Sequence, residues 1–325
     1  MTTTWGLLST ARINGYIISG AHKSDRVEIT AVASRDGARA EAYARDNDIK
    51  RAYGTYEELL AAPDIDAVYI PLPNSMHVDW TIRALEAGKH VLCEKPLSRH
   101  TADVERAFSV AEGTGRLLME AFMYRHNPQT ARLKELVQSG VVGTPQLVRA
   151  AFSFNLTRPN DIRMSAELEG GSLMDVGCYC VSGTRNLLGE PHTVFGEQVT
   201  SPSGVDKVFS GSMRMAGDVL ASFDSALTLT TRDELEVIGD EASLFVDDPW
   251  HCRSPVIELR SDDKVEAIDL DAADSYQLQL ENFSDAITGD AQPLLGRKDA
   301  VGQARAIEAL YRSADEGRPV SLSDG

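Results

Sequence analysis

Short apolar runs alternate with amphipathic segments over the first third of the chain. A brief, largely apolar run bounded by glycine and proline, such as residues 90–93, is typical of a strand buried on both faces of a parallel sheet. The strands predicted in this way span residues 5–8, 27–33, 67–71, 90–93 and 116–121. The helices predicted between them span residues 12–22, 36–46, 56–60, 75–87 and 102–112. This alternation predicts right-handed crossovers and a Rossmann-like α/β sheet with helices on both faces.

The pattern changes after residue 122. A break at 126–128 precedes an amphipathic helix at 129–139, an alternating strand at 145–154 and a helix at 172–188. Further strands are predicted over residues 195–200, 208–215, 219–230, 234–238, 243–246, 256–259 and 265–270, before two closing helices at 276–287 and 299–314. Turn-bounded strands without intervening helices favour a large, open, mostly antiparallel sheet. We therefore expect an N-terminal Rossmann domain over 1–122 and a C-terminal α+β domain over 123–325, which suits a chain about twice the usual domain length.

The charge and composition of the chain argue against nucleic acid and membranes as partners. The 32 basic and 49 acidic residues give a net charge of -17, which repels phosphate backbones and anionic membranes. No apolar run approaches ~20 residues and no basic leader opens the sequence, so neither nucleic acid nor a membrane is expected as a partner. Cys93, Cys178, Cys180 and Cys252 lack metal-pair or disulfide-framework spacing. We expect reduced thiols, a cytoplasmic location and no metal site.

Glu94-Lys95-Pro96 follows the predicted strand at 90–93. Ligands of open parallel sheets bind at the carboxyl ends of the strands, where a lysine can act as a fixed charge or a proton donor. The alternative interpretation is a plain exit from a strand into a turn.

The first strand runs into Ser9, Ala11, Arg12 and Ile13, where a dinucleotide fold has its glycine-rich turn. Small residues at 9 and 11 would let the backbone approach a pyrophosphate, and the following helix would offer N–H donors. The glycine fingerprint is incomplete, so a tight turn without a ligand remains the alternative.

Ser34 and Arg35 end the second strand, with Arg39 one helical turn further on. An acidic residue at this point would bind the ribose 2'-hydroxyl of NAD, whereas serine and arginine can hold a 2'-phosphate. The sequence therefore favours NADP, with NAD possible. The alternative is a solvated Ser-Arg pair before a helix that Asp36 caps.

On the predicted helix at 172–188, Asp175, Tyr179, Ser182 and Asn186 share one stripe at 100° per residue. A carboxylate and a phenol one turn apart could be presented together to a polyol, and Gly170-Gly171 would admit a close-approaching ligand. The alternative is that the stripe faces water.

Less specific candidates are Pro71, Leu72, Asn74 and His77 after the strand at 67–71, Tyr124 and Arg125 at the junction of the two parts, and Asn160, Arg158 and Arg163 in one loop.

Residues 5–13, Pro71 to His77, Glu94-Lys95-Pro96 and 170–179 together resemble the Gfo/Idh/MocA oxidoreductase family. Within it, the chain is most similar to the branch of NADP-dependent D-xylose 1-dehydrogenases, dimeric dihydrodiol dehydrogenases and glucose-fructose oxidoreductases. The resemblance implies an NAD(P)-binding Rossmann domain and a C-terminal substrate-binding and oligomerisation domain. Tyr179 stands where inositol dehydrogenases carry histidine, which argues against inositol oxidation.

The resemblance also implies the roles of individual residues. Lys95, Tyr179 and Asp175 are expected to be catalytic, with Tyr179 carrying the proton and Lys95 lowering a phenol pKa that is ~10 in water. The residues expected to bind cofactor are Ser9, Ala11, Arg12, Ile13, Ser34, Arg35, Arg39, Pro71, Leu72, Asn74, His77, Glu94, Lys95 and Arg163. Those expected to bind a carbohydrate substrate are Lys95, Tyr124, Arg125, Asn160, Asp175 and Tyr179.

The activity expected is hydride transfer between NADP and a sugar or polyol, of the aldose 1-dehydrogenase type. Two alternatives stay open: reduction of a ketosugar, such as 1,5-anhydrofructose or a nucleotide-linked 3-ketosugar, and a cofactor-bound sensor without turnover. The open sheet would expose an apolar face around Val219, Ala221 and Phe223 unless something covered it. We therefore expect a homodimer or tetramer formed through the C-terminal sheet.

Overall fold

The computed structural model describes residues 2–158 and 160–322. The chain forms two compact units, Met1–Met123 with Asp274–Val301, and Tyr124–Ala273 with Gly302–Gly325. The first boundary lies beside the expected one at 122/123. However, residues 274–301 also belong to the first unit, which the expected division into 1–122 and 123–325 did not include. Trp5 contacts this later segment: its ring lies 5.8 Å from that of Phe283 and its indole N–H donates to Ser284.

The first unit contains a six-stranded parallel sheet in the order β3-β2-β1-β4-β5-β6. Its strands are β1 (Thr3–Leu8), β2 (Val27–Ala33), β3 (Arg51–Tyr53), β4 (Ala67–Ile70), β5 (His90–Cys93) and β6 (Leu118–Glu120). Every residue of β4 and β5 is buried, as expected for central parallel strands. The sequence did not predict β3, because an edge strand of Arg-Ala-Tyr has too short an apolar pattern; pairing with Ala31–Ala33 of β2 forms it.

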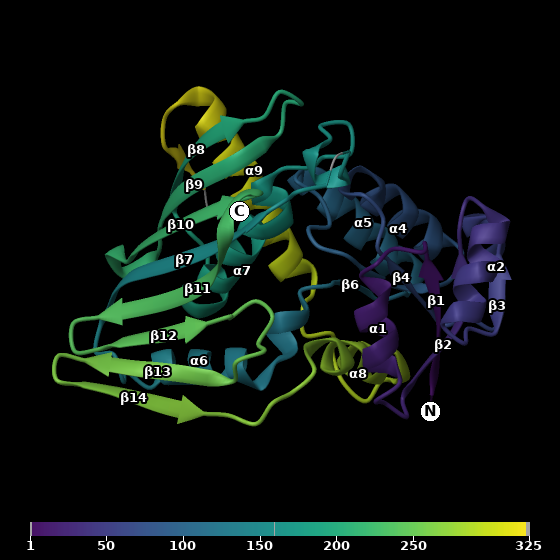
Figure 1. Ribbon diagram of the computed structural model, residues 1–325, viewed down its shortest axis with the longest axis horizontal. Helices are drawn as coiled ribbons and strands as arrows, with labels where there is room; N and C mark the ends of the chain where they lie inside the picture. Colours follow the sequence, from purple (N-terminus) through teal and green to yellow (C-terminus); the bar gives the residue numbers. More distant parts are fainter. Residues whose placement is uncertain (1, 159, 323–325) are drawn as a thin grey trace. The chain divides into compact units, whose positions relative to one another are not determined.

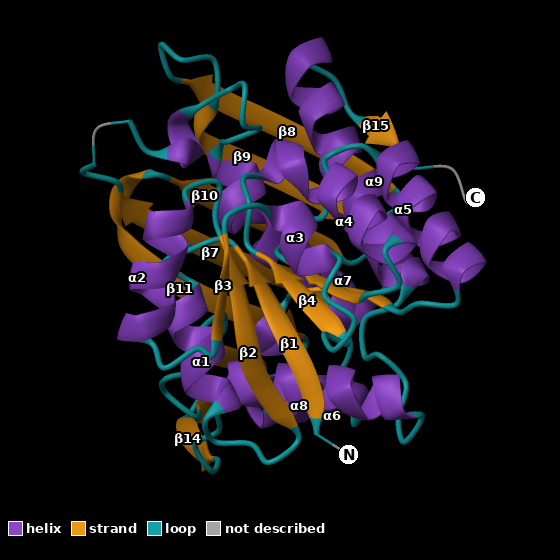
Figure 2. Cartoon of the chain, turned by 90° about the vertical axis from the view of Figure 1, so that its right-hand side faces the viewer, coloured by secondary structure: helices purple, strands orange, loops and turns teal. Residues whose placement is uncertain are grey.

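Helices flank this sheet, as Figure 2 shows around β1 to β4. They are α1 (Asn14–Ala21), α2 (Gly37–Asp46), α3 (Tyr56–Leu60), α4 (His77–Glu86), α5 (Thr101–Thr114) and α8 (Ser275–Thr288), while α9 (Arg297–Glu316) begins in this unit and continues into the other. Local signals set their ends. Thr55 and Glu58 form a capping box at α3, and Gly115 ends α5 in the left-handed conformation.

The second unit contains a nine-stranded sheet in the order β14-β13-β12-β11-β7-β10-β9-β8-β15, which Figure 1 shows as a row of arrows. Its strands are β7 (Pro145–Asn155), β8 (Thr193–Thr200), β9 (Asp206–Arg214), β10 (Leu220–Ala226), β11 (Thr228–Gly239), β12 (Ser243–Asp247), β13 (Val256–Ser261), β14 (Lys264–Asp269) and β15 (Val320–Ser321). Only β10 and β7 pair in parallel among the described neighbours. The helices α6 (Pro128–Gln138) and α7 (Cys178–Leu188) pack against the sheet.

The predicted strand at 219–230 is wrong, because the chain breaks at Leu227 into β10 and the start of β11. These two strands lie on opposite sides of β7, so the chain must cross from one side of β7 to the other. Buried Leu227 makes the crossing, donating its N–H to Lys207 O and accepting from Leu156 N.

The predicted exposure of Val219, Ala221 and Phe223 is also corrected. These side chains are 7, 1 and 3% exposed, because helices of the same unit cover this face of β10. The other face of the sheet carries the exposed side chain of Leu220, which is 47% accessible. Alternation along a strand explains the contrast between neighbouring residues.

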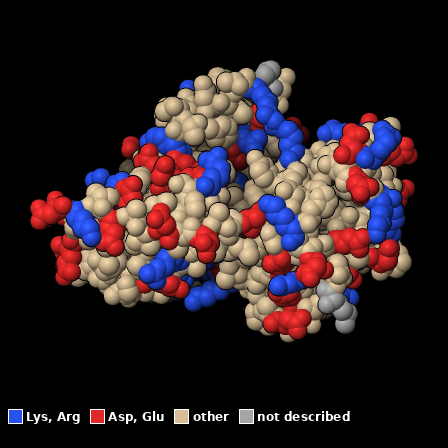
Figure 3. Space-filling model, turned by 60° about the horizontal axis from the view of Figure 1, so that its bottom comes forward, with Lys and Arg blue, Asp and Glu red and all other residues tan. Residues whose placement is uncertain are grey.

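No described helix is long and apolar enough to cross a bilayer. On the face that Figure 3 shows, acidic and basic side chains are interspersed and do not gather into one basic patch.

Candidate active site

The turn after β1 has the geometry that a dinucleotide turn needs. Ser9 takes a φ of 149°, in the region that favours glycine, and its carbonyl accepts from Asn14 Nδ2 at 2.8 Å. Ser9 Oγ accepts the N–H of Ala11 at 3.2 Å. No side chain caps the start of α1, where Ile13 is the N-cap residue. This uncapped helix N-terminus behind a turn of small residues fits a pyrophosphate group.

Cationic side chains lie at the end of β2. Ser34 is buried, and Arg35 and Arg39 are exposed. Burial raises the pKa of Tyr56, while a hydrogen bond and the charge of Arg35, with the charge of Arg39, act in the opposite direction. Asp36 also caps α2 through the N–H of Arg39, so the capping interpretation holds as well. Two guanidinium groups beside one phenol fit a phosphate on the adenosine ribose.

Glu94 leaves β5 with its N–H bonded to Ile70 O at 3.0 Å and its carboxylate 2.5 Å from the hydroxyl of Tyr69. The Lys95–Pro96 peptide bond is cis, and Lys95 is half-buried at this carboxyl edge of the sheet. The edge location predicted for Lys95 is therefore observed.

His77 has contacts that its expected cofactor role did not anticipate. Its Nδ1 lies 2.9 Å from Pro96 O and its Nε2 lies 2.8 Å from Leu72 O. Burial lowers the pKa of His77, so the neutral ring donates to one of these carbonyls at a time. The ring links the turn after β4 to the segment after Lys95. Pro71 and Leu72 are buried beside it, and Asn74 begins the short 3₁₀ helix Asn74–Met76.

In the second unit, a π-helical turn (Leu173–Gly177) leads directly into α7. The N–H of Leu173 and the hydroxyl of Ser172 donate to buried Asp206 Oδ2 at 2.7 and 2.8 Å. A Cβ at Gly171 would lie 2.1 Å from Asp206 Oδ1, and one at Gly170 would lie 2.3 Å from Arg163 O. Both glycines are therefore required by protein packing, where the sequence predicted room for a ligand.

Asp175 lies in the π-helical turn and forms an ion pair with Arg163, whose Nε is 2.7 Å from Asp175 Oδ2. Arg163 Nη1 lies 3.2 Å from Asp161 Oδ1. Asp175 first, and then Asp161, raise the pKa of Arg163. The guanidinium predicted to bind cofactor thus has two carboxylate partners within its own unit. Asn160, in the same loop, is exposed.

The polar stripe of this segment is buried at its centre, which excludes the alternative that it is a solvent-exposed helix face. Tyr179 is 7% and Ser182 0% exposed. Ser182 Oγ accepts from the hydroxyl of Tyr124 at 2.8 Å and from Arg125 Nη1 at 3.4 Å. The ring of Tyr179 lies 5.7 Å from that of Tyr124, so two predicted site residues are brought together.

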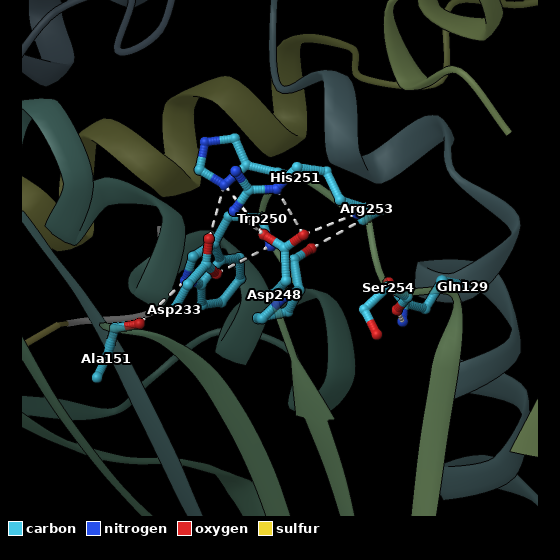
Figure 4. A network of polar contacts seen from close by, with 10 residues as sticks. Gln129, Ala151, Asp233, Asp248, Trp250, His251, Arg253 and Ser254 are labelled. Atoms are coloured by element: carbon cyan, nitrogen blue, oxygen red, sulfur yellow. Dashed lines mark hydrogen bonds and ion pairs between the residues drawn. The ribbon is translucent and has the colours of Figure 1, made fainter. Parts of the chain in front are cut away.

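Sequence reasoning missed the rest of the surroundings of Tyr179. Phe152 lies 5.4 Å and Trp250 lies 6.1 Å from its ring. Beside them is a polar cluster, drawn in Figure 4, of Asp233, Asp248, His251 and Arg253. Asp233 lies on β11 and the other three in the loop after β12, so the pairing of that loop with β11, which no sequence motif marks, brings them together.

The comparisons with known proteins agree with this architecture. Residues 10–122 match the oxidoreductase family with an NAD-binding Rossmann fold, and residues 130–245 match the GFO/IDH/MocA C-terminal domain. The chain is 38% identical to D-xylose 1-dehydrogenase (NADP(+)) 2 of Haloferax volcanii, over 98% of this chain and 99% of that protein.

Two solved structures are similar over almost their whole length. The aldose-aldose oxidoreductase of Caulobacter crescentus, complexed with glycerol, is 26% identical with a TM-score of 0.92, over 99% of this chain and 100% of the other. A 3-ketoreductase from Actinomadura kijaniata, in complex with NADP and TDP-benzene, is 28% identical with a TM-score of 0.91, over 96% and 98%. The chain therefore belongs to the Gfo/Idh/MocA family of oxidoreductases.

Proposed function

We propose that this oxidoreductase transfers a hydride between NADP and a sugar or related polyol, in the manner of an aldose 1-dehydrogenase. The observation that carries the proposal is the setting of Tyr179, a buried phenol on α7 among aromatic rings, with Asp175 on the preceding turn held by an ion pair with Arg163. The likeness to the Haloferax D-xylose 1-dehydrogenase supports a sugar as the substrate.

The cofactor is assigned to the first unit. Ser9, Ala11, Arg12 and Ile13 would hold the pyrophosphate at the uncapped end of α1. The residues assigned to the 2'-phosphate are Ser34, Arg35 and Arg39, and those assigned to the nicotinamide half are Pro71, Leu72, Asn74, Glu94 and Lys95. When bound, NADP supplies the hydride acceptor in oxidation and the hydride donor in reduction.

In this proposal, side chains of the protein transfer the proton of the substrate hydroxyl. Tyr179 would take the proton of the substrate hydroxyl in oxidation and return it to the carbonyl oxygen in reduction. A free phenol has a pKa of ~10, too high for an efficient base near neutrality. An ammonium group lowers that value, and we assign this role to Lys95. Asp175, held by Arg163, would orient substrate hydroxyls, together with Tyr124, Arg125 and Asn160.

Reduction of a ketosugar is the second candidate, because the chain also resembles the Actinomadura 3-ketoreductase. A nucleotide-linked sugar would require cations for a second pyrophosphate. Arg163 already binds Asp161 and Asp175, which favours an unattached sugar over a sugar nucleotide. A sensor without turnover is the third candidate.

A spectrophotometric screen tests the proposal. Aldoses, polyols and diols are incubated with NADP or NAD and followed at 340 nm, and ketosugars are incubated with the reduced cofactors. We expect oxidation of at least one free aldose with NADP, and turnover at least ~100-fold lower by Tyr179→Phe. Turnover limited to ketosugars would select the reductase, and NADP binding without any turnover would select the sensor.

We also propose that the protein forms a homodimer, or a tetramer made of two such dimers, through the open face of the nine-stranded sheet. Strand pairing places Val199, Leu220 and Val265 on this one face, where they are 53, 47 and 63% exposed. Ser212 and Ser222 lie opposite each other at its centre and would let two sheets approach closely. The four cysteines are buried, and reduced thiols at these positions would support a cytoplasmic location.

A further inference from the structure

The loop after β12 folds back onto β11 and packs around Asp233. Asp248 N donates to Asp233 O at 2.8 Å, and Trp250 N donates to Asp233 Oδ1 at 3.3 Å. Trp250 Nε1 donates to Ala151 O of the neighbouring β7 at 3.1 Å, and Trp250 is fully buried. These three contacts hold the residue that follows Trp250 in a defined position.

That residue is His251. Its Nδ1 lies 2.7 Å from Asp233 Oδ2 and 3.2 Å from Asp248 Oδ1. Burial raises the pKa of Asp233 to about 6, so above that pH its carboxylate is ionised and only accepts hydrogen bonds, and the Nδ1 atom carries a hydrogen. In the neutral ring, Nε2 is then an acceptor, and Figure 4 shows it pointing away from both carboxylates. The side chain is 39% exposed, so this nitrogen is available to a ligand.

His251 is placed beside the proposed proton carrier. Phe152 meets both rings edge to face, with centroids 5.5 Å from His251 and 5.4 Å from Tyr179. The register of the sheet explains this, since Asp233 of β11 lies directly opposite Phe152 of β7. One phenyl ring therefore separates an imidazole acceptor from the phenol.

A metal ion is a weaker interpretation of this cluster. Ligand atoms of Asp233, Asp248 and His251 lie within 4.8 Å of one another. However, Arg253 Nε lies 2.8 Å from Asp248 Oδ2, and Arg253 Nη2 lies 2.7 Å from Asp248 Oδ1. The guanidinium occupies both oxygens of Asp248 and supplies the positive charge that a cation would bring.

We propose that His251 is a substrate-binding residue, which accepts a hydrogen bond from one hydroxyl group of the sugar through Nε2. Asp233 is its positioning residue, because it fixes the tautomer and the orientation of the ring. This assignment rests on the proposed function and adds a specificity contact to it. Sugars differ in the position and orientation of their hydroxyl groups, so one fixed acceptor beside Tyr179 selects among them.

The test compares His251→Phe, which keeps a ring against Phe152 but removes the acceptor, with His251→Gln, which keeps a polar group at a similar reach. His192→Phe, at an exposed histidine of the same unit, is the matched control. Each protein is assayed with the best sugar of the wild type and with its monodeoxy analogues. Sugar binding to the NADP-loaded proteins is also titrated by tryptophan fluorescence, which does not depend on turnover.

We expect His251→Phe to raise the KM and the Kd for the sugar roughly 10-fold, with kcat within about threefold, as loss of one polar contact implies. One monodeoxy sugar should bind wild type and His251→Phe equally, which identifies the hydroxyl. His251→Gln should recover part of the loss, Asp233→Asn should weaken sugar binding less than His251→Phe, and His192→Phe should match wild type.

Equal sugar affinity of wild type and His251→Phe would overturn the assignment and leave the proposed function intact. An equal loss for every deoxy sugar would also overturn it, since a purely structural defect acts without regard to one hydroxyl. No turnover or binding of any sugar by the wild type would remove both proposals.

Discussion

Arg163 Nε lies 2.7 Å from Asp175 Oδ2, and the two residues belong to a loop and a π-helical turn that a sequence motif would treat as separate. The arginine side chain is 35% and the aspartate side chain 17% exposed, so the pair is partly screened by water. Its importance is geometric, because it fixes the carboxylate assigned to the substrate hydroxyls.

Arg163→Met is expected to raise the KM for the sugar about 10-fold, because Asp175 loses the partner that orients it. The Kd for NADP should stay within about threefold, since the guanidinium is already engaged by two carboxylates. Steady-state kinetics and cofactor titration measure these values, with Arg158→Met in the same loop as the control. A loss of NADP affinity instead would return Arg163 to the cofactor site.

Arg35→Asp should reverse the cofactor preference. A charge-assisted contact contributes ~1.5 to 3 kcal/mol, so NADP should bind roughly ten- to a hundredfold more weakly while NAD gains relative to it. Fluorescence titration with both cofactors measures the change. Arg45→Asp, on the last turn of the same helix α2, controls for charge alone. Equal affinities for NADP and NAD in the wild type would refute the assignment.

Tyr179→Phe should reduce turnover ~100- to 10,000-fold, because it removes the proposed proton carrier but keeps the ring against Phe152 and Trp250. NADP binding should be nearly intact. Lys95→Met should lose activity too, and the double variant should be little worse than the worse single one if the two residues act together as proposed. In the wild type, the oxidation rate should rise with pH through an apparent pKa below that of a free phenol.

That ionisation should be missing from the pH profile of Tyr179→Phe. If this variant kept more than about a tenth of the wild-type rate, another proton carrier would be required, because loss of a ~100-fold acid-base contribution would leave far less activity than that. Asp175 would be the first candidate.

Asp206 makes stability depend on pH. Burial raises the pKa of Asp206 above 3.8, although Leu173, Ser172 and Tyr311 donate hydrogen bonds to it. Because the folded pKa is the higher one, the stability contributed by this group is full below 3.8 and is lost as pH rises through the folded value.

Asp206→Asn removes this titrating group. It also places an N–H donor of the asparagine amide against groups that already donate to this position, so it should lower the free energy of unfolding by ~1 to 3 kcal/mol. The difference from wild type should be largest at acid pH and shrink as pH rises. Urea unfolding at a series of pH values measures it. A difference that did not vary with pH would contradict the assignment of Asp206.

Ser212→Arg with Ser222→Arg should convert the proposed dimer to monomers, because two opposed arginines at the centre of the open face would have to be buried without partners. Light scattering at micromolar concentration measures the mass. Ala102→Arg, at an exposed position of α5, should leave it unchanged. A monomeric wild type under these conditions would refute the proposed assembly.

The sequence by itself determined the parallel half and the positions of its motifs. Residues 27–33 and 90–93 are strands at the predicted bounds, because burial on both faces leaves a local apolar run that needs no knowledge of the partner strands. Parallel strands end at a common edge, so motifs following them could be assigned to that edge before the fold was seen.

Only the tertiary structure decided which distant residues surround Tyr179. The alternation of β7 and β11 marks their faces but not their register, and it is the register that places Asp233 opposite Phe152 and, through the folded-back loop, His251 beside it. Likewise, residue periodicity assumes an α-helix throughout 172–188, whereas the helix begins with a π-helical turn whose start Asp206 caps. Periodicity is a property of neighbours along the chain, and long-range pairing is not encoded in it.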